Sequence, residues 1–347
     1  MEEARILFYS VKKCGYYKRG QKTSAFGNLS EAVTALSQWV QGKPLGETCT
    51  YQVKDDDAHD RTYCFKLVRL KTGSSLLVLW NESPSAEGNV ATVDAAATVG
   101  SAAISLTEIP PNSIPGYATY FWIIPDRQLI ATVSFHHRIS GYHPLYKYMR
   151  GFLRSFFAPH VVFGEPEDGS GDDQLVVGYR ETDQSPVMSL TPSFHMSLVE
   201  HPGQIQLIKS RRTEIKKIVR KDDLLPNHNE DSSLIKKLLI SLGIQNPHTT
   251  PTEYRIKYEL GFSPDEDELN EIIESWKTSS ESESGEADWN DVGFVFSGES
   301  APHWLSHSVE RQVIELEVER DNEELVNPGS LLKALEVKRK FLLRNIK

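Results

Sequence analysis

Short runs of β-branched and aromatic residues separated by polar turns dominate the first half of the chain. This pattern is typical of β-strands joined by loops. The clearest pair is 117–124 and 128–135, which flank Pro125-Asp126-Arg127 and predict a hairpin. Two segments instead place apolar residues at helical spacing, and they predict helices at 31–40 and 144–157. Further strands are expected at 5–11, 50–53, 62–70 and 74–80.

The second half mixes both periods. Ser263-Pro264-Asp265 opens an acidic segment with a cap residue, a proline and early carboxylates, which predicts the start of a helix. The tract 278–291 is polar and of low complexity, typical of a disordered loop. Strands are expected at 193–199, 204–209, 253–260, 292–298 and 311–319, and a last helix at 328–344.

These elements show no strict β-α-β alternation, so the sequence predicts an α+β fold: mixed, mainly antiparallel sheets with flanking helices, in two lobes. A length of 347 residues suggests about two domains. We expect an N-terminal α+β domain at 1–200 and a C-terminal α+β domain at 201–347 that contains an acidic loop at 278–290.

Charge is unevenly placed along the chain, whose net charge is −10. Residues 161–200 sum to −7 and 251–300 to −11, whereas 1–160 and 201–250 each sum to +4. Basic residues gathered on one face could therefore still bind a polyanion.

Several classes are excluded or disfavoured by what the chain lacks. No run of about 18 apolar residues is present, so no direct membrane insertion is expected. The N-terminus lacks an apolar signal core, and three cysteines in a long chain favour a reducing compartment, so we expect a cytoplasmic protein. No phosphate-binding loop, CxxC, HExxH or GxSxG motif occurs. The sequence predicts no cofactor, no metal and no identifiable catalytic residue.

The first basic segment, 12–22, interleaves cations with tyrosines and glycines. Lysine and arginine neutralise phosphates, and tyrosine rings can stack on sugars or exposed bases. A solvated loop is the competing interpretation. The predicted nucleic-acid contacts here are Lys12, Lys13, Tyr16, Tyr17, Lys18, Arg19 and Lys22.

The second basic segment, 209–221, carries seven cations and one acid. Read as a helix, it places Arg212, Lys216 and Arg220 on one stripe, where like charges are unfavourable without a counter-surface. That surface could be nucleic acid, or the acidic block 265–291 within the fold. The predicted contacts are Lys209, Arg211, Arg212, Lys216, Lys217, Arg220 and Lys221.

Three weaker chemical candidates remain. His136 and His137, with His143 nearby, suggest metal ligands, although strand alternation separates the first two. Asp55, Asp56, Asp57 and Asp60 with His59 suggest an acidic metal site, but aspartates are also common in turns. Cys14 follows Lys12 and Lys13, which could lower its pKa.

The order of elements resembles the phage lambda exclusion protein family, that of RexA, along most of the chain. The similar segments are 6–24 (ILFYSVKKCGYYKRGQKTS), 115–135 (PGYATYFWIIPDRQLIATVSF), 194–199 (FHMSLV), 234–243 (LIKKLLISLG) and the late charged helix. This chain is longer, with extra material around 82–105 and 278–290. The resemblance implies a dimeric, sequence-tolerant binder of double-stranded DNA that acts in phage exclusion, an abortive-infection type of antiviral defence. It also implies a membrane-associated effector protein as partner. The loop 12–22 matches by position and character.

Three functions therefore stay open. The first is sequence-tolerant binding of double-stranded DNA through the two basic segments. The second is a metal-dependent nuclease of a defence system that uses carboxylates such as Asp55–Asp57 or Glu165–Asp173. The third is a protein-interaction module whose acidic surface, at 265–291, binds a basic partner or mimics a nucleic acid.

Overall fold

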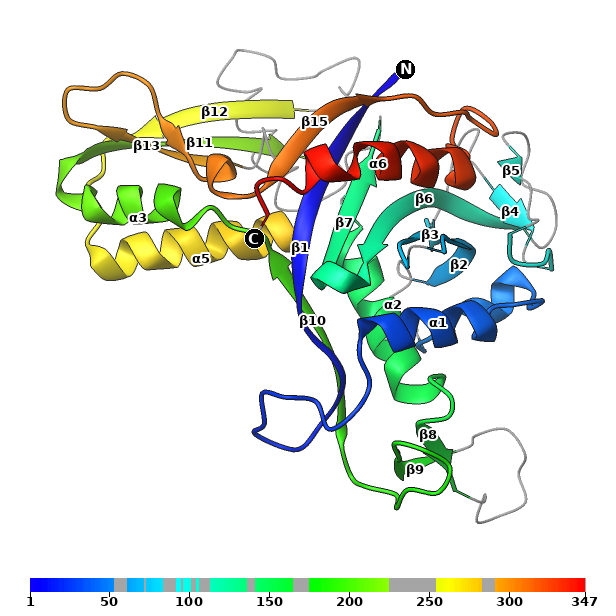
Figure 1. The fold of residues 1–347 in the computed structure, drawn as a ribbon. Helices are drawn as coiled ribbons and strands as arrows, with labels where there is room; N and C mark the ends of the chain where they lie inside the picture. The colour runs from blue at the N-terminus through cyan, green and yellow to red at the C-terminus, as the bar shows by residue number, and fades with distance from the viewer. Residues whose placement is uncertain are drawn as a thin grey trace, which may run out of the picture. The chain divides into compact units, whose positions relative to one another are not determined.

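A computed structural model describes residues 1–52, 61–71, 73–83, 92–94, 96–100, 104–105, 113–135, 141–164, 175–224, 254–282 and 291–346. The fold is α+β, and the pairs of strands in its sheets are antiparallel (Figure 1). Two compact units divide the chain. Unit 1 comprises Met1–Val199 together with Arg311–Lys347, and unit 2 comprises Glu200–Glu310.

Unit 1 is built on a nine-stranded sheet with the central order β10-β1-β7-β6-β3-β2. The long first strand pairs with β10 and β15 along one edge and with β7 along the other. The strands of this sheet are β1 (Glu2–Tyr17), β2 (Thr62–Arg69), β3 (Ser75–Glu82), β4 (Thr92–Asp94), β5 (Ile104–Ser105), β6 (Ser113–Ile124), β7 (Leu129–Ser134), β10 (Thr191–Leu198) and β15 (Arg311–Leu316). A separate ribbon pairs β8 (Val161–Phe163) with β9 (Val176–Tyr179).

Both faces of this sheet are covered, which explains the nearly continuous apolar runs in β3 and β6. Helix α6 (Pro328–Leu342) packs on one face, where Leu331 and Leu335 join a core with Trp80 and Trp122. Helices α1 (Leu29–Trp39) and α2 (Tyr142–Ser155) lie on the other face (Figure 1). The 74–80 run therefore forms a strand that is buried on both sides.

Several predicted elements of unit 1 are confirmed. The β6–β7 hairpin turns at 125–127, as the proline and aspartate there indicate. Asn28 caps α1, because its side-chain oxygen accepts a hydrogen bond from the Glu31 amide at 3.0 Å. The helix expected at 144–157 is α2, and the last helix is α6.

Unit 2 is built on a four-stranded sheet with the order β12-β11-β13-β14. Helices α3 and α5 lie on the same side of this sheet (Figure 1). The elements are α3 (Pro202–Ser210), β11 (Ile215–Leu224), β12 (Tyr254–Leu260), α5 (Glu266–Ser282), β13 (Asp291–Phe296) and β14 (His303–Trp304).

Two sequence predictions in this unit are wrong. The strand expected at 204–209 is helix α3, because Pro202 favours a first helical turn and the buried Ile205 and Ile208 lie three residues apart. The helix expected at 209–221 does not form. Helix α3 ends at Ser210, and β11 begins at Ile215. Pairing with β12 and β13 on both edges fixes the β conformation there.

The extents of three regions also differ from the prediction. The chain returns to unit 1 at Arg311, so 311–347 is not part of the second compact unit. Helix α5 continues to Ser282 and includes the first residues of the tract 278–291 that was expected to be a loop. The segment 12–17 belongs to strand β1 because it pairs with β10.

Candidate nucleic-acid interface

The first basic segment forms the end of β1 and the turn that follows it. Tyr16 pairs with Phe26 in an antiparallel bridge, so residues 18–24 are a closed turn that projects from the end of the strand. Lys18, Arg19 and Lys22 are exposed on this turn. We call residues 12–22 the basic loop.

The cations of the basic loop are not neutralised by carboxylates of the described chain. Lys12 is exposed, and the ammonium of Lys13 lies 5.2 Å from the centre of the Tyr17 ring. Within the part of the chain that the structure describes, no ion pair involves any of the five cations of the loop, Lys12, Lys13, Lys18, Arg19 and Lys22. Their charge is therefore available to an anion from outside.

Two glycines let the base of this loop close. Gly15 has a φ of 134° and Gly27 a φ of 80°, values in the region that favours glycine. A β-carbon on Gly15 would lie 2.5 Å from the carbonyl oxygen of Gly27. The two chain segments thus approach more closely than side chains would permit.

An aromatic cluster anchors the same base. The Tyr16 ring centre lies 5.0 Å from that of Phe26, 6.0 Å from Phe157, 5.5 Å from His160 and 4.7 Å from Tyr179. The Tyr16 hydroxyl donates a hydrogen bond to the carbonyl of Leu153 on α2 at 2.8 Å. The basic turn is therefore mounted on a packed, hydrogen-bonded support.

These contacts correct the predicted role of the two tyrosines. Tyr16 is fully buried, and Tyr17 is 6% exposed with its hydroxyl accepting a hydrogen bond from the Cys14 amide at 3.2 Å. Neither ring offers a face on which a base could stack. Burial also raises the pKa of the Tyr16 hydroxyl above its ordinary value.

Cys14 is not an activated thiol. It is 7% exposed, and burial raises its pKa to about 12, the opposite of the lowering that the nearby lysines suggested. Cys14 pairs with Phe194 of β10 and is part of the core. Its role is structural packing.

The second basic segment is largely engaged within unit 2. Arg211 contacts Glu214 and Glu299, each at 2.7 Å, and lies 4.1 Å from the centre of the Phe296 ring. Lys217 contacts Glu259 at 3.0 Å.

Three of the remaining cations of this segment make other contacts within unit 2. Arg212 donates to the carbonyl oxygen of Pro264 at 3.2 Å. Lys221 lies 4.2 Å from the centre of the Trp304 ring, and Arg220 lines a groove beside α5. Because Arg212 lies in a short 3₁₀ turn and Lys216 and Arg220 lie in β11, these three residues do not form the predicted helical stripe. Among the described residues, only Lys209 and Lys216 of this segment are exposed without a contacting carboxylate or ring.

Part of the charge of 209–221 is thus neutralised within unit 2. The acids in the ion pairs of Arg211 and Lys217 are Glu214, Glu259 and Glu299, which lie outside the block 265–291; residues 283–290 of that block lie outside the described part of the chain. The two basic segments therefore differ in how far their cations are paired. No described carboxylate pairs with the cations of the basic loop, whereas Arg211 and Lys217 of 209–221 form ion pairs.

The candidate metal and nuclease residues do not form a described site. No group of three or more histidine, cysteine, aspartate or glutamate side chains that could hold a metal occurs in the described ranges. The aspartates Asp55, Asp56, Asp57 and Asp60 with His59, the pair His136 and His137, and the block Glu165–Asp173 lie outside the described residues.

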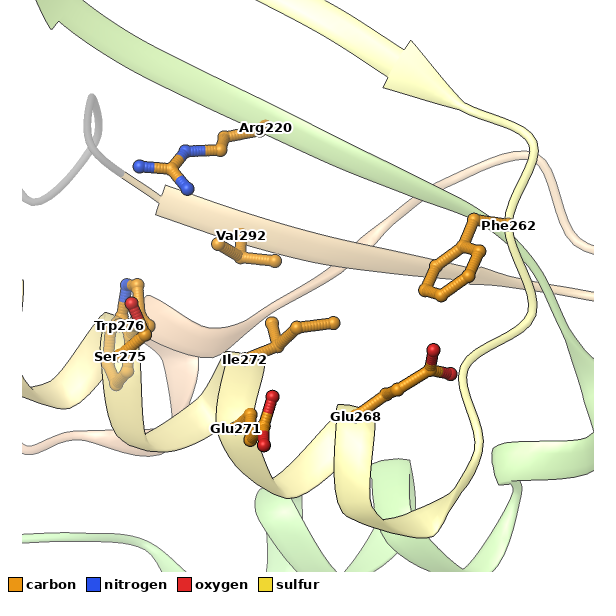
Figure 2. A pocket seen from close by; sticks show the side chains of 8 residues that line it. All are labelled: Arg220, Phe262, Glu268, Glu271, Ile272, Ser275, Trp276 and Val292. Atoms are coloured by element: carbon orange, nitrogen blue, oxygen red, sulfur yellow. The ribbon is translucent and has the colours of Figure 1, made fainter.

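A groove in unit 2, between α5 and the sheet, was not predicted from the sequence. Figure 2 shows the side chains that surround it, with Ile272 and Glu271 on the helix and Arg220 and Val292 on the strands. Its volume is about 340 Å³. The sequence signal for this groove is Ile272 beside acidic residues. A helix with one buried stripe does not require an apolar residue at that position, and the structure leaves Ile272 half-buried.

The chain matches no protein-family model, no curated protein and no solved structure. The resemblance to the exclusion proteins therefore stays a prediction. Among the described residues, no helix is long and apolar enough to cross a bilayer.

Proposed function

We propose that this protein binds double-stranded DNA in a sequence-tolerant manner, with the basic loop as the principal contact. The observation that carries the proposal is the set of five cations on this loop, which no carboxylate of the described chain pairs. Unpaired cations that contact DNA phosphates displace the counterions condensed on the DNA, and the release of these counterions drives association.

The support beneath the loop favours such a role. Ordering a mobile loop on binding would cost conformational entropy, whereas a loop held by the Gly15–Gly27 contact and the Tyr16 cluster is ordered beforehand. The buried tyrosines leave lysine and arginine as the contacting groups. Contacts from these residues to phosphate oxygens carry no base information, so little sequence preference is expected.

Lys209 and Lys216 of unit 2 are proposed as additional phosphate contacts. The engaged cations of the same segment, such as Arg211 and Lys217, would have to break ion pairs to contribute. A role in phage exclusion, a homodimeric state and a membrane-associated effector are carried by the resemblance alone, and they remain proposals.

The experiment is a fluorescence anisotropy titration with random-sequence duplex DNA at about 50 and 200 mM salt. The test variant is Lys18→Gln/Arg19→Gln/Lys22→Gln, and the matched control is Lys333→Gln/Lys338→Gln/Lys340→Gln on α6, which removes the same charge from the same unit. Each phosphate contact contributes about 0.9 to the slope of log K against log salt, so the test variant should lower the slope by about 3. The control variant should bind as the wild type does.

The same titration with Mg²⁺ separates binding from cleavage. Intact DNA in the presence of Mg²⁺ agrees with a binding protein. Cleavage would instead indicate a nuclease that uses carboxylates of the acidic segments. If the loop variant and the α6 variant weaken binding equally, net charge rather than the loop is responsible and the proposal fails.

A further inference from the structure

The groove beside α5 has an apolar floor and an acidic wall. Ile272, Val292 and Phe262 provide apolar surface, and Trp276 closes one end (Figure 2). Glu268 and Glu271 project from the helix along the same side. Arg220 of β11 lines the strand side of the groove, so the negative charge is confined to the helix side. The volume of the groove lies in the range of binding sites.

The apolar surface continues from the groove onto strand β12. Tyr258 lies opposite Arg220 in the β11–β12 register and Leu260 lies opposite Ile218, so both share the face of Arg220. Tyr258 is 37% exposed, Leu260 52% and Phe262 40%. Large apolar side chains exposed at successive positions of one face commonly mark an interaction surface.

Strand β12 also has an edge that the described sheet leaves open. In the described parts of unit 2, β12 pairs with β11 alone. Edge strands are usually protected by charges, and β12 carries Lys257 and Glu259 on its other face. The two β12 residues described on the face of Arg220, Tyr258 and Leu260, are uncharged.

Charge decides which occupant fits. From Glu266 to Trp276, α5 carries five carboxylates and no cation, and the first cation is Lys277, which pairs with Glu200 at 2.8 Å and Glu274 at 3.3 Å. Glu268 accepts a hydrogen bond from the Asp265 amide at 2.8 Å and stays at the groove wall. Glu271 is exposed beside the apolar floor.

We propose that this groove docks a short segment of a partner protein that combines apolar anchor residues with lysine or arginine. The apolar side chains of the segment enter between Phe262, Ile272 and Val292, and its cations face Glu268 and Glu271. This inference is independent of the DNA-binding proposal, because a polyanion is repelled by the same wall. The small contact area predicts a weak, rapidly reversible complex.

The test uses the full chain and two fluorescent peptides of about 12 residues, one of leucine and lysine at helical spacing and one with glutamate in place of lysine. The leucine–lysine peptide should bind with a Kd below about 50 µM, and the leucine–glutamate peptide should not bind in this range. Glu271→Lys and Phe262→Ser should each weaken binding at least about tenfold. Glu315→Lys, an exposed position of unit 1, should leave it unchanged.

Three results would overturn the inference. The leucine–lysine peptide could fail to bind, or both groove variants could bind it as tightly as the wild type. Alternatively, sedimentation could show self-association that Phe262→Ser abolishes, in which case a second copy of the chain is the occupant. Circular dichroism of each variant confirms that the fold is retained, and since Glu271 and Phe262 are exposed, loss of the fold is not expected.

Discussion

Gly15 and Gly27 face one another where the basic loop closes; Gly15 has no room for a side chain, and Gly27 has little. A β-carbon on Gly27 would lie 3.2 Å from the Gly15 α-carbon, and the reverse contact, to the Gly27 carbonyl oxygen, would be 2.5 Å. At Gly15 the three nearest atoms all belong to the backbone, so a rotamer change cannot relieve the overlap. The geometry of the loop therefore depends on these two residues.

Gly15→Ala is expected to destabilise the protein by at least about 2 kcal/mol and to weaken DNA binding, because the strand must move away from Gly27. Gly20, at φ 79° with no atom within 4 Å of its would-be β-carbon, is the matched control. Gly20→Ala should cost only about 1 kcal/mol, from backbone strain alone. Urea denaturation measures both, and equal losses would contradict the importance of the close approach.

The two core thiols should be unreactive in the folded protein. Burial raises the pKa of Cys14 and of Cys64 to about 12, so only about 1 in 10,000 molecules carries either thiolate near pH 8. We expect iodoacetamide to leave both residues unmodified in the native state and to modify both in concentrated guanidinium. Peptide mass spectrometry gives the measurement, and rapid native labelling of Cys14 would show that its strand opens readily.

Asp291 should make stability depend on pH in an unusual direction. It is 1% exposed, and burial raises its pKa to about 6 from an ordinary value near 3.8. The folded state thus holds a proton that the unfolded state releases between these values, so stability falls as pH rises through this window. The full effect is about 3 kcal/mol, from about 1.36 kcal/mol per pKa unit.

The variant Asp291→Asn isolates this effect. The Oδ1 atom of Asp291 accepts hydrogen bonds from the amides of Val292 at 2.8 Å and Ser306 at 3.1 Å, and an asparagine oxygen can accept the same two bonds. We expect the variant to be more stable than the wild type near pH 8 and similar near pH 4. Denaturation curves across this range give the answer, and a parallel pH dependence in both proteins would assign it to another group.

Local signals in the sequence were sufficient to predict elements whose stabilising contacts join residues close together in the chain. The helix predicted at 31–40, the 125–127 turn and the last helix follow from apolar spacing and turn chemistry within a few residues. The prediction of a helix at 209–221 is wrong. The helical spacing of its cations is a weaker constraint than pairing with two strands that are distant in the sequence.

The candidate site shows the same division between local and distant information. The cations of the basic loop could be identified from composition, and the structure leaves their charge free. The burial of Tyr16 could not, since it depends on Phe157 and Tyr179, more than a hundred residues away. Ion pairs such as Lys217–Glu259 likewise join residues that no local pattern connects.

The two ends of unit 2 are held together by contacts of their own. Glu200 pairs with Val309 in an antiparallel bridge, the His201 amide donates to the Ser308 carbonyl at 2.6 Å, and the His201 ring lies 2.6 Å from the Glu310 carboxylate. Residues that pair in this way have α-carbons about 4.5–5.5 Å apart. A short linker can therefore span the place where unit 2 is inserted.

We expect unit 1 to fold when 200–310 is replaced by about four glycine and serine residues, because its core contains strands on both sides of the insertion, β1 and β15. A single cooperative thermal transition with the circular dichroism of a folded protein is the expected outcome. The shortened protein retains the basic loop, so it should still bind duplex DNA with a steep salt dependence. If the shortened protein folds but no longer binds DNA, the DNA contacts lie in unit 2. If it shows no thermal transition, unit 1 needs unit 2 to fold.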